Sequence, residues 1–181
     1  SEDLINDISI TSNELIYQIN DEIIQTKNNS KAEGENTVIN ADNFTYYKLT
    51  NILNAKENVK VYDKVKSFTI ISNDLDYLKN EEKFISRQKS EAYDDNLNIK
   101  ATKFEYDKNL KILNAHTNVV IKDKTNDAII FSENITYFEN SEKIITQGNV
   151  EAIIENKYKF KSKNPILYRN KKLLNSKYET T

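Results

Sequence analysis

The chain has no cysteine, methionine or tryptophan, and only two glycines, one proline and one histidine among its 181 residues. The absence of cysteine excludes disulfides and thiolate metal sites. It says little about the compartment, because a secreted domain with a large core can do without disulfides. His116 has no second histidine or cysteine beside which to bind a metal. We therefore expect an exposed polar position there, no metal site and no cofactor.

An excess of charge of one sign and long apolar runs are also missing. The formal net charge of -2 provides no basic face for nucleic acid, so we expect no nucleic-acid partner. No run of about 18 apolar residues is present, so no bilayer-spanning helix is predicted. The mean hydropathy of -0.73 would by itself permit disorder. The regular spacing of the apolar residues argues against it.

Groups that could carry catalysis are equally scarce. Glu81 with Glu82, and Asp94 with Asp95, are neighbouring carboxylates, but they lie in turn-like polar segments without an apolar pocket to shift their pKa. We expect solvated turns at both places. A Gly-rich phosphate loop is missing as well. Because no convergent set of reactive groups is present, the chain is not predicted to be an enzyme.

What the chain does contain is an internal repeat. Residues 41–61 return as residues 101–121, at a fixed offset of 60 residues. The first set, Phe44, Tyr46, Ile52, Leu53, Asn54, Ala55, Asn58 and Val59, matches Phe104, Tyr106, Ile112, Leu113, Asn114, Ala115, Asn118 and Val119. Residues 72–85 likewise align without gaps on residues 132–145. Agreement at a fixed offset indicates a repeat architecture.

Each repeat divides into two smaller units marked by a tyrosine. The tyrosines are Tyr17, Tyr46, Tyr77, Tyr106, Tyr137 and Tyr168, spaced 29, 31, 29, 31 and 31 residues apart. Two residues before them stand Leu15, Phe44, Leu75, Phe104, Ile135 and Ile166. The sixth unit is irregular, because Ser162 comes one place early and Pro165 lies inside it. The spacing predicts about six tandem units of 29–31 residues.

The best-defined unit predicts strand, turn and strand. Phe104 and Tyr106 are two residues apart and project from the same side of an extended chain. A polar turn follows at residues 107–109. Leu113 then resumes the alternation, and Asn118 marks a bend or bulge before the next apolar residues. No window has sustained helical spacing. We therefore predict an all-β, antiparallel fold.

We expect residues 1–11 to form a tail or a ragged first strand, and residues 12–181 to form one domain. The chain stops soon after Leu173 and Leu174 begin a second strand, so we expect it to be part of a longer protein.

Two facing sheets built from such units would enclose an apolar interior. If the sheets close tightly, the interior is a core; if they separate, the same side chains line a trough for an aliphatic chain. The sequence leaves both open. The candidate lipid-binding residues are Phe44, Leu53, Val59, Val61, Leu75, Phe84, Phe104, Tyr106, Leu113, Val119, Ile121, Ile135, Ile144 and Val150.

The repeated pattern resembles the OstA-like domains of the lipopolysaccharide transport machinery of Gram-negative bacteria. It stands here as Ala101, Phe104, Tyr106, Asp107, Leu113, Ala115, Asn118, Val119 and Ile121, and the resemblance extends over about residues 12–174. The resemblance implies an open, V-shaped antiparallel β-jellyroll whose interior carries the acyl chains of lipopolysaccharide across the periplasm. It also implies that neighbouring OstA-like domains join through edge-strand pairing.

Two members of the family fit these features. One is the soluble periplasmic bridge protein, and the other is the N-terminal periplasmic domain of the outer-membrane translocon, whose further partner is the outer-membrane barrel. The apparent truncation favours the translocon domain, whereas the absence of cysteine counts against it. Both imply a periplasmic location. The alternative is a repetitive β-solenoid or adhesin module that binds another protein and no lipid. Solenoids usually contain more glycine at their corners than the two glycines of this chain, which counts against the alternative.

One further feature is the run Lys157, Lys159, Lys161 and Lys163, which alternates with Tyr158 and Phe160. Charged residues commonly protect an exposed strand edge, and a contact with lipid phosphates is the second interpretation.

Overall fold

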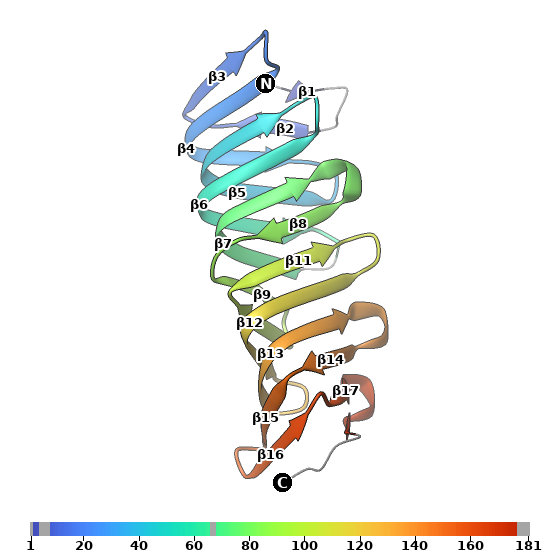
Figure 1. Ribbon diagram of the computed structural model, residues 1–181. Coiled ribbons are helices and arrows are strands. Elements are labelled where there is room, and N and C mark those ends of the chain that lie inside the picture. The colour runs from blue at the N-terminus through green and yellow to red at the C-terminus, as the bar shows by residue number, and fades with distance from the viewer. Residues whose placement is uncertain (1, 4–7, 66–67, 177–181) are drawn as a thin grey trace. The chain divides into compact units, whose positions relative to one another are not determined.

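The computed structural model describes residues 2–3, 8–65 and 68–176. Over this part of the chain antiparallel β-strands are joined by short turns, and the helical segments are three short 3-10 turns (Figure 1). The all-β, antiparallel prediction is confirmed: the strands described pair antiparallel, whereas a β-solenoid is built from parallel pairs. The chain divides into two units, Ser1–Ala92 and Tyr93–Thr181. The prediction of a tail at residues 1–11 and one domain at 12–181 stays a prediction, and its residues 1, 4–7, 66–67 and 177–181 lie outside the described part.

Unit 1 consists of hairpins built from long strands. Its strands are β1 (Glu2–Asp3), β2 (Ile8–Thr11), β3 (Glu14–Gln18), β4 (Ile23–Glu33), β5 (Thr37–Tyr47), β6 (Ile52–Asp63), β7 (Phe68–Leu78) and β8 (Lys83–Ser86), with η1 (Lys79–Glu81) before β8. The strand β9 (Ser90–Tyr93) reaches the division between the units.

Unit 2 also consists of antiparallel hairpins, but only two of its strands, β12 and β13, are long. Its strands are β10 (Leu97–Ala101), β11 (Lys103–Asp107), β12 (Ile112–Asp123), β13 (Ala128–Phe138), β14 (Lys143–Gln147), β15 (Asn149–Ile154), β16 (Tyr158–Lys163), β17 (Ile166–Tyr168) and β18 (Leu173–Asn175). The turns η2 (Glu139–Ser141) and η3 (Arg169–Lys171) precede β14 and β18.

Within unit 2 the strands form one continuous antiparallel sheet, which the bulge of β12 divides into two parts. Residues 112–116 of β12 pair with β11 and with residues 134–138 of β13. Its residues 119–123 pair with residues 128–132 of β13, and residues 120–123 also pair with residues 97–100 of β10. We call the first group, with β14, β17 and β18, the first sheet, and the second group, with β15 and β16, the second sheet. The inner faces of both sheets are apolar and buried.

A bulge separates the two halves of β12. The register shifts between His116 and Val119, and the two residues between them, Thr117 and Asn118, have φ values of 65° and 55°. The bend predicted at Asn118 is therefore confirmed. A bulge leaves residues unpaired and turns the strand, so one continuous strand can serve both sheets. The same bulge follows Lys56 in β6 of unit 1.

The sixth unit differs from the prediction by one residue. Ile144 pairs with Tyr137 on one side and with Leu167 on the other, so Leu167 holds the place that tyrosine holds in the other units. Assigning Tyr168 and Ile166 to the repeat was wrong. The segment containing Pro165 shifts the register by one residue, and side chains alternate with a period of two, so Tyr168 projects to the opposite face of the sheet.

Candidate functional site

The inner faces of the two sheets form the apolar interior of unit 2. Because side chains alternate between the two faces of a strand, β12 directs four residues into this interior, each at most 1% exposed: Leu113, Ala115, Val119 and Ile121. The intervening bulge residues are exposed, so the alternation continues from one sheet to the other across the bend. The periodicity of the sequence thus produces one apolar lining on two sheets.

The fourteen predicted lipid-binding residues are all buried, with exposed fractions between 0% and 4%. In unit 1 they are Phe44, Leu53, Val59, Val61, Leu75 and Phe84; in unit 2 they are Phe104, Tyr106, Leu113, Val119, Ile121, Ile135, Ile144 and Val150. Each set is brought together inside its own unit. Because these side chains are shielded from solvent by other protein atoms, an acyl chain would have to displace those contacts. Lipid binding by these residues stays a prediction.

The repeated tyrosines combine a buried ring with a hydrogen-bonded hydroxyl. Tyr46 donates to Asn51 Oδ1 over 2.8 Å, and Tyr77 donates to Glu82 Oε1 over 2.7 Å. Tyr106 reaches Glu139 Oε1 over 3.0 Å. Burial, and then the hydrogen bond to Glu82, raise the pKa of Tyr77. The hydroxyls therefore hold the turns as neutral donors.

A cavity of about 300 Å³ lies between the sheets at the C-terminal end of unit 2. Its apolar lining comes from Ala128, Ile130, Ala152 and Ile154 of the second sheet and from Leu167 and Leu174 of the first. Asp123, Asn126 and Arg169 line its polar side. Here β17 and β18 have only three residues each, and such short strands provide few side chains to fill the space.

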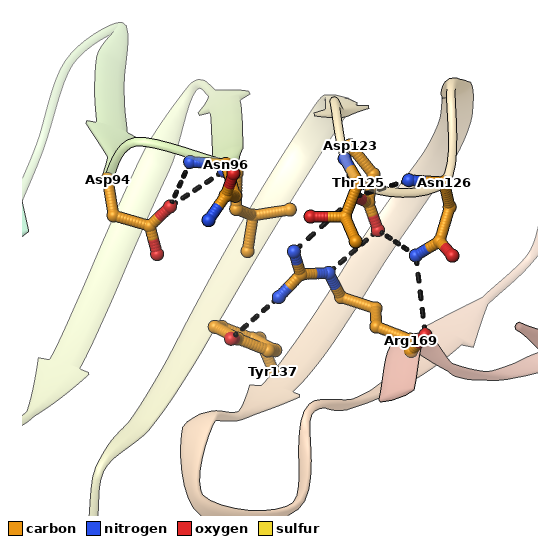
Figure 2. A network of polar contacts seen from close by, with 8 residues as sticks. Asp94, Asn96, Asp123, Thr125, Asn126, Tyr137 and Arg169 are labelled. Atoms are coloured by element: carbon orange, nitrogen blue, oxygen red, sulfur yellow. Dashed lines mark hydrogen bonds and ion pairs between the residues drawn. The ribbon is translucent and has the colours of Figure 1, made fainter. Parts of the chain in front are cut away.

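A buried ion pair lies at the polar side of this cavity (Figure 2). Arg169 Nε donates to Asp123 Oδ2 over 2.7 Å, and Arg169 Nη1 donates to the hydroxyl of Tyr137 over 3.2 Å. The side chains of Arg169 and Asp123 are 7% and 3% exposed. Asp123 also accepts the backbone N–H groups of Thr125 and Asn126, so the turn orients its carboxylate toward Arg169.

The pKa values in this network follow from burial and charge. Burial alone would raise the pKa of Asp123, but hydrogen bonds from Arg169 and Asn126 hold it below its ordinary value. Burial likewise works against the charge of Arg169, and Asp123 outweighs it and raises the pKa of Arg169. Burial raises the pKa of Tyr137 to about 12 against the opposing effect of Arg169. At neutral pH the pair is therefore charged and Tyr137 is neutral.

Asn126 completes the network through its side-chain amide nitrogen, whereas its amide oxygen has no hydrogen-bond partner in the described part of the chain. Its Nδ2 donates to Asp123 Oδ2 over 2.8 Å and to the carbonyl oxygen of Arg169 over 3.4 Å. Because both partners are acceptors, the orientation of the amide is determined. Its Oδ1 is buried and has no hydrogen-bond partner within the described part of the chain. An unsatisfied acceptor at a cavity is available to a ligand or a water molecule.

Among solved structures the protein is similar to LptH of Pseudomonas aeruginosa, described as the LptA-homologous periplasmic component of the conserved lipopolysaccharide transport device. The superposition has a TM-score of 0.57 at 11% sequence identity, and it covers 61% of this chain and 85% of LptH. This likeness establishes the fold, and the predicted β-jellyroll is confirmed. No protein-family model matches the sequence, and no curated protein matches it.

The sequence interpretation missed the ion pair. Two signals pointed to it: Asp63 and Asp123 recur at the 60-residue offset, and Arg87 and Arg169 are the only arginines of a lysine-rich chain. A repeated aspartate at the end of an apolar strand suggests a buried carboxylate, and both aspartates are indeed buried. The partner could not be predicted, because Arg169 comes from the irregular sixth unit.

The other polar candidates lie in exposed places. His116 is exposed, with its Nδ1 3.2 Å from Asn134 Oδ1, as predicted. Glu82 is the left-handed residue that ends η1, and Asp94 caps its own turn by accepting the N–H groups of Asn96 and Leu97 (Figure 2). The expected turns at these carboxylates are confirmed. In the described residues no group of three or more acidic or histidine side chains could hold a metal ion.

Three lysines of the run, Lys159, Lys161 and Lys163, lie in β16, and Lys157 directly precedes it; in the described part of the chain β16 pairs with β15 alone. Lys159 and Lys161 lie 2.7 Å and 3.8 Å from the carboxylate of Glu151, and these ion pairs lower the pKa of Glu151. The protective interpretation of an edge strand therefore accounts for these two lysines. No helix among the described residues is long and apolar enough to cross a membrane.

Proposed function

We propose that this protein is a periplasmic lipid carrier. It holds the acyl chains of lipopolysaccharide between the sheets of its jellyroll and passes them toward the outer membrane. The observation that carries the proposal is the apolar cavity of unit 2, which continues the buried inner faces of both sheets. The jellyroll fold shared with LptH, a periplasmic component of a lipopolysaccharide transport device, supports it.

The energetics of such a carrier favour transfer between similar sites over release into water. Burying a methylene group is worth about 0.8 kcal/mol, so a twelve-carbon chain gains on the order of 10 kcal/mol relative to water. A chain held this way leaves slowly for water, but it moves at little net cost into an adjoining site of similar apolarity. Continuity between neighbouring apolar sites therefore matters more than tight binding at one of them.

Edge strands provide the means of continuity. Among the described residues β3 of unit 1 pairs with β4 alone, and in unit 2 β16 pairs with β15 alone and β18 with β17 alone. Such edges accept a further strand. We propose that neighbouring OstA-like domains add here, either in a stand-alone bridge protein or in the periplasmic domain of an outer-membrane translocon. In the second case the outer-membrane barrel is the final partner.

Two adjacent isoleucines of β13 provide a matched test. Ile130 faces the cavity and is 1% exposed, whereas Ile129 is half-buried on the opposite face. A photocrosslinking amino acid is placed at one position or the other, and each protein is irradiated with lipopolysaccharide. We expect capture at position 130 and little at position 129. Equal capture at both positions, or capture at neither, would contradict the proposal.

A further inference from the structure

The ion pair of unit 2 links one sheet to the other. Asp123 ends the part of β12 that belongs to the second sheet, whereas Arg169 begins η3, directly after β17 of the first sheet. Tyr137, the second partner of Arg169, also belongs to the first sheet. The contact therefore spans the interior, as Figure 2 shows, and its residues line one side of the cavity, which is partly open to solvent.

At this end β17 and β18 are held by short ladders and by hydrogen bonds from Thr146 to the Pro165 carbonyl and from the Arg169 N–H to the Glu142 carbonyl. β14 pairs with β17 over three residues, and β17 pairs with β18 over three. By contrast, β12 and β13 pair over ten positions on both sides of their bulge. Elements with short ladders open locally at low cost. The position of β17, η3 and β18 over the cavity therefore depends in part on the contact between Asp123 and Arg169.

A buried ion pair is suited to specifying this closed arrangement. The cost of removing both charges from water offsets much of their attraction, so such a pair is weak evidence for stability, whereas separating the partners inside the protein is costly. Nη2 of Arg169 adds a contact of 3.4 Å to Asp123 Oδ1, and Asn126 bonds both the carboxylate and the Arg169 carbonyl. The carboxylate is therefore held from two elements at once.

We propose that Asp123, Asn126, Tyr137 and Arg169 form a releasable clasp, which holds the two sheets of unit 2 together and controls access to the cavity. In the closed state Arg169 bonds Asp123 across the interior. In the open state the two separate, η3 and β18 move from the second sheet, and an apolar chain reaches Ala152 and Ile130. The role in lipid access rests on the proposed function of the cavity, whereas the clasp itself does not require a lipid.

A cysteine reporter tests the clasp without any lipid. The chain has no cysteine, so Ala152→Cys places a single thiol in the cavity lining, at a position that is 1% exposed. The rate of its alkylation by a small maleimide is measured with the clasp intact and with Arg169→Gln. Asp123→Asn, which keeps the size of the side chain, is the milder second variant. We expect the thiol at position 152 to be alkylated at least about tenfold faster in the clasp variants, which corresponds to a tenfold shift of the equilibrium from the closed to the open state.

A second thiol separates local opening from general destabilisation. The control is Ala115→Cys. Ala115 is 0% exposed in the same interior and lies beside the bulge of β12, outside the cavity lining. If the clasp acts locally, its loss accelerates alkylation at position 152 and much less at position 115. Equal acceleration at both positions in both variants, or no acceleration at position 152, would overturn the clasp.

The lipid arm uses an environment-sensitive fluorescent dodecanoate added to the otherwise unaltered chain and to the two clasp variants. Faster uptake in the variants, with position-specific alkylation, supports both the clasp and the lipid site. Position-specific alkylation without binding of the dodecanoate in any protein leaves the clasp standing and contradicts the proposed function. Binding at unchanged rates in all three proteins contradicts control of access by the clasp and leaves the lipid site standing.

Discussion

At the scale of single residues, the turns adopt left-handed backbone conformations without glycine. In each of the six strand-turn-strand units, the residue before the second strand has a φ between 48° and 59°. These residues are Glu22, Asn51, Glu82, Lys111, Glu142 and Lys172. A residue with a Cβ atom pays roughly 1–2 kcal/mol for this conformation. Backbone hydrogen bonds between successive turns offset that cost, as from the Glu139 N–H to the carbonyl of Lys111 over 3.1 Å.

Replacing Glu142 by glycine should stabilise the protein. Its φ of 48° is relaxed in glycine, and we expect the free energy of unfolding to rise by roughly 0.5–1 kcal/mol after the larger entropy of the unfolded glycine is subtracted. The measurement is urea unfolding. Ser141→Gly, one position earlier in η2 and outside the left-handed region, is the control and should destabilise slightly. A loss of stability in Glu142→Gly comparable to the control would refute the strain argument.

The ion pair should make the stability of unit 2 depend on pH in the acid range. The pKa of Asp123 is lowered in the folded protein, so its stabilising contribution is fully present above the unfolded value of about 3.9 and is lost as the pH falls through the folded value. The difference in free energy of unfolding between the unaltered protein and Asp123→Asn should therefore be constant at neutral pH and shrink below about pH 4. Urea unfolding between pH 7 and pH 3 measures it, and a difference that grows toward acid pH would show the opposite sign.

At the scale of elements, long bent strands and short edge strands have different roles. β12 and β13 pass through both sheets of unit 2 and join them covalently, whereas β17 and β18 belong to the first sheet alone. In unit 1 all five residues of the edge strand β3 are exposed. Its Leu15 and Tyr17 pair with Thr26 and Ile24, whose side chains are buried. Leu15 and Tyr17 therefore continue the inner face to the end of the unit.

Lysine at these two inner positions should block addition of a further strand at β3. In an added domain, Leu15→Lys with Tyr17→Lys would place two charges in a continuous apolar interior, which is unfavourable without partners. If copies of the chain add at β3, the mass measured by light scattering should rise with concentration in the unaltered protein and stay constant in this variant. The control, Ile16→Lys, lies between them on the outer face and is 51% exposed in the present structure. Loss of association in the control alone would contradict the proposed edge.

At the scale of the whole molecule, the 60-residue repeat places equivalent residues in two units. Leu53 pairs with Tyr46 and Tyr77 in unit 1, and Leu113 pairs with Tyr106 and Tyr137 in unit 2. Both leucines are 0% exposed. Stacked repeats have stabilities that are sums of unit and interface contributions, so equivalent substitutions reveal whether the units unfold together.

Leu53→Ala and Leu113→Ala should each lower the stability by about 2–5 kcal/mol, because each leaves a cavity among fully buried side chains. If residues 12–181 are one domain, as predicted, either substitution moves one common unfolding transition. The measurement combines circular dichroism and calorimetry across the thermal transition. Two transitions, of which each substitution moves a different one, would show that the units are separate domains.

The sequence predicted most of the local structure because a strand fixes the direction of its side chains. The period of two placed Phe104, Tyr106 and Leu113 on the same face, and all three are buried together in unit 2. The bend at Asn118 was predictable because asparagine tolerates the left-handed conformation that a bulge requires. The sixth unit was misaligned, because a spacing counted between tyrosines does not detect that Leu167 has replaced one.

By itself, then, the sequence determined which elements form and which face of each is apolar, since both depend on neighbours along the chain. Only the tertiary structure decided how closely the sheets approach, where a cavity remains, and that Arg169 meets Asp123 from a segment 46 residues away. Such contacts depend on the packing of side chains distant in sequence, and no local periodicity specifies the distance between two facing sheets.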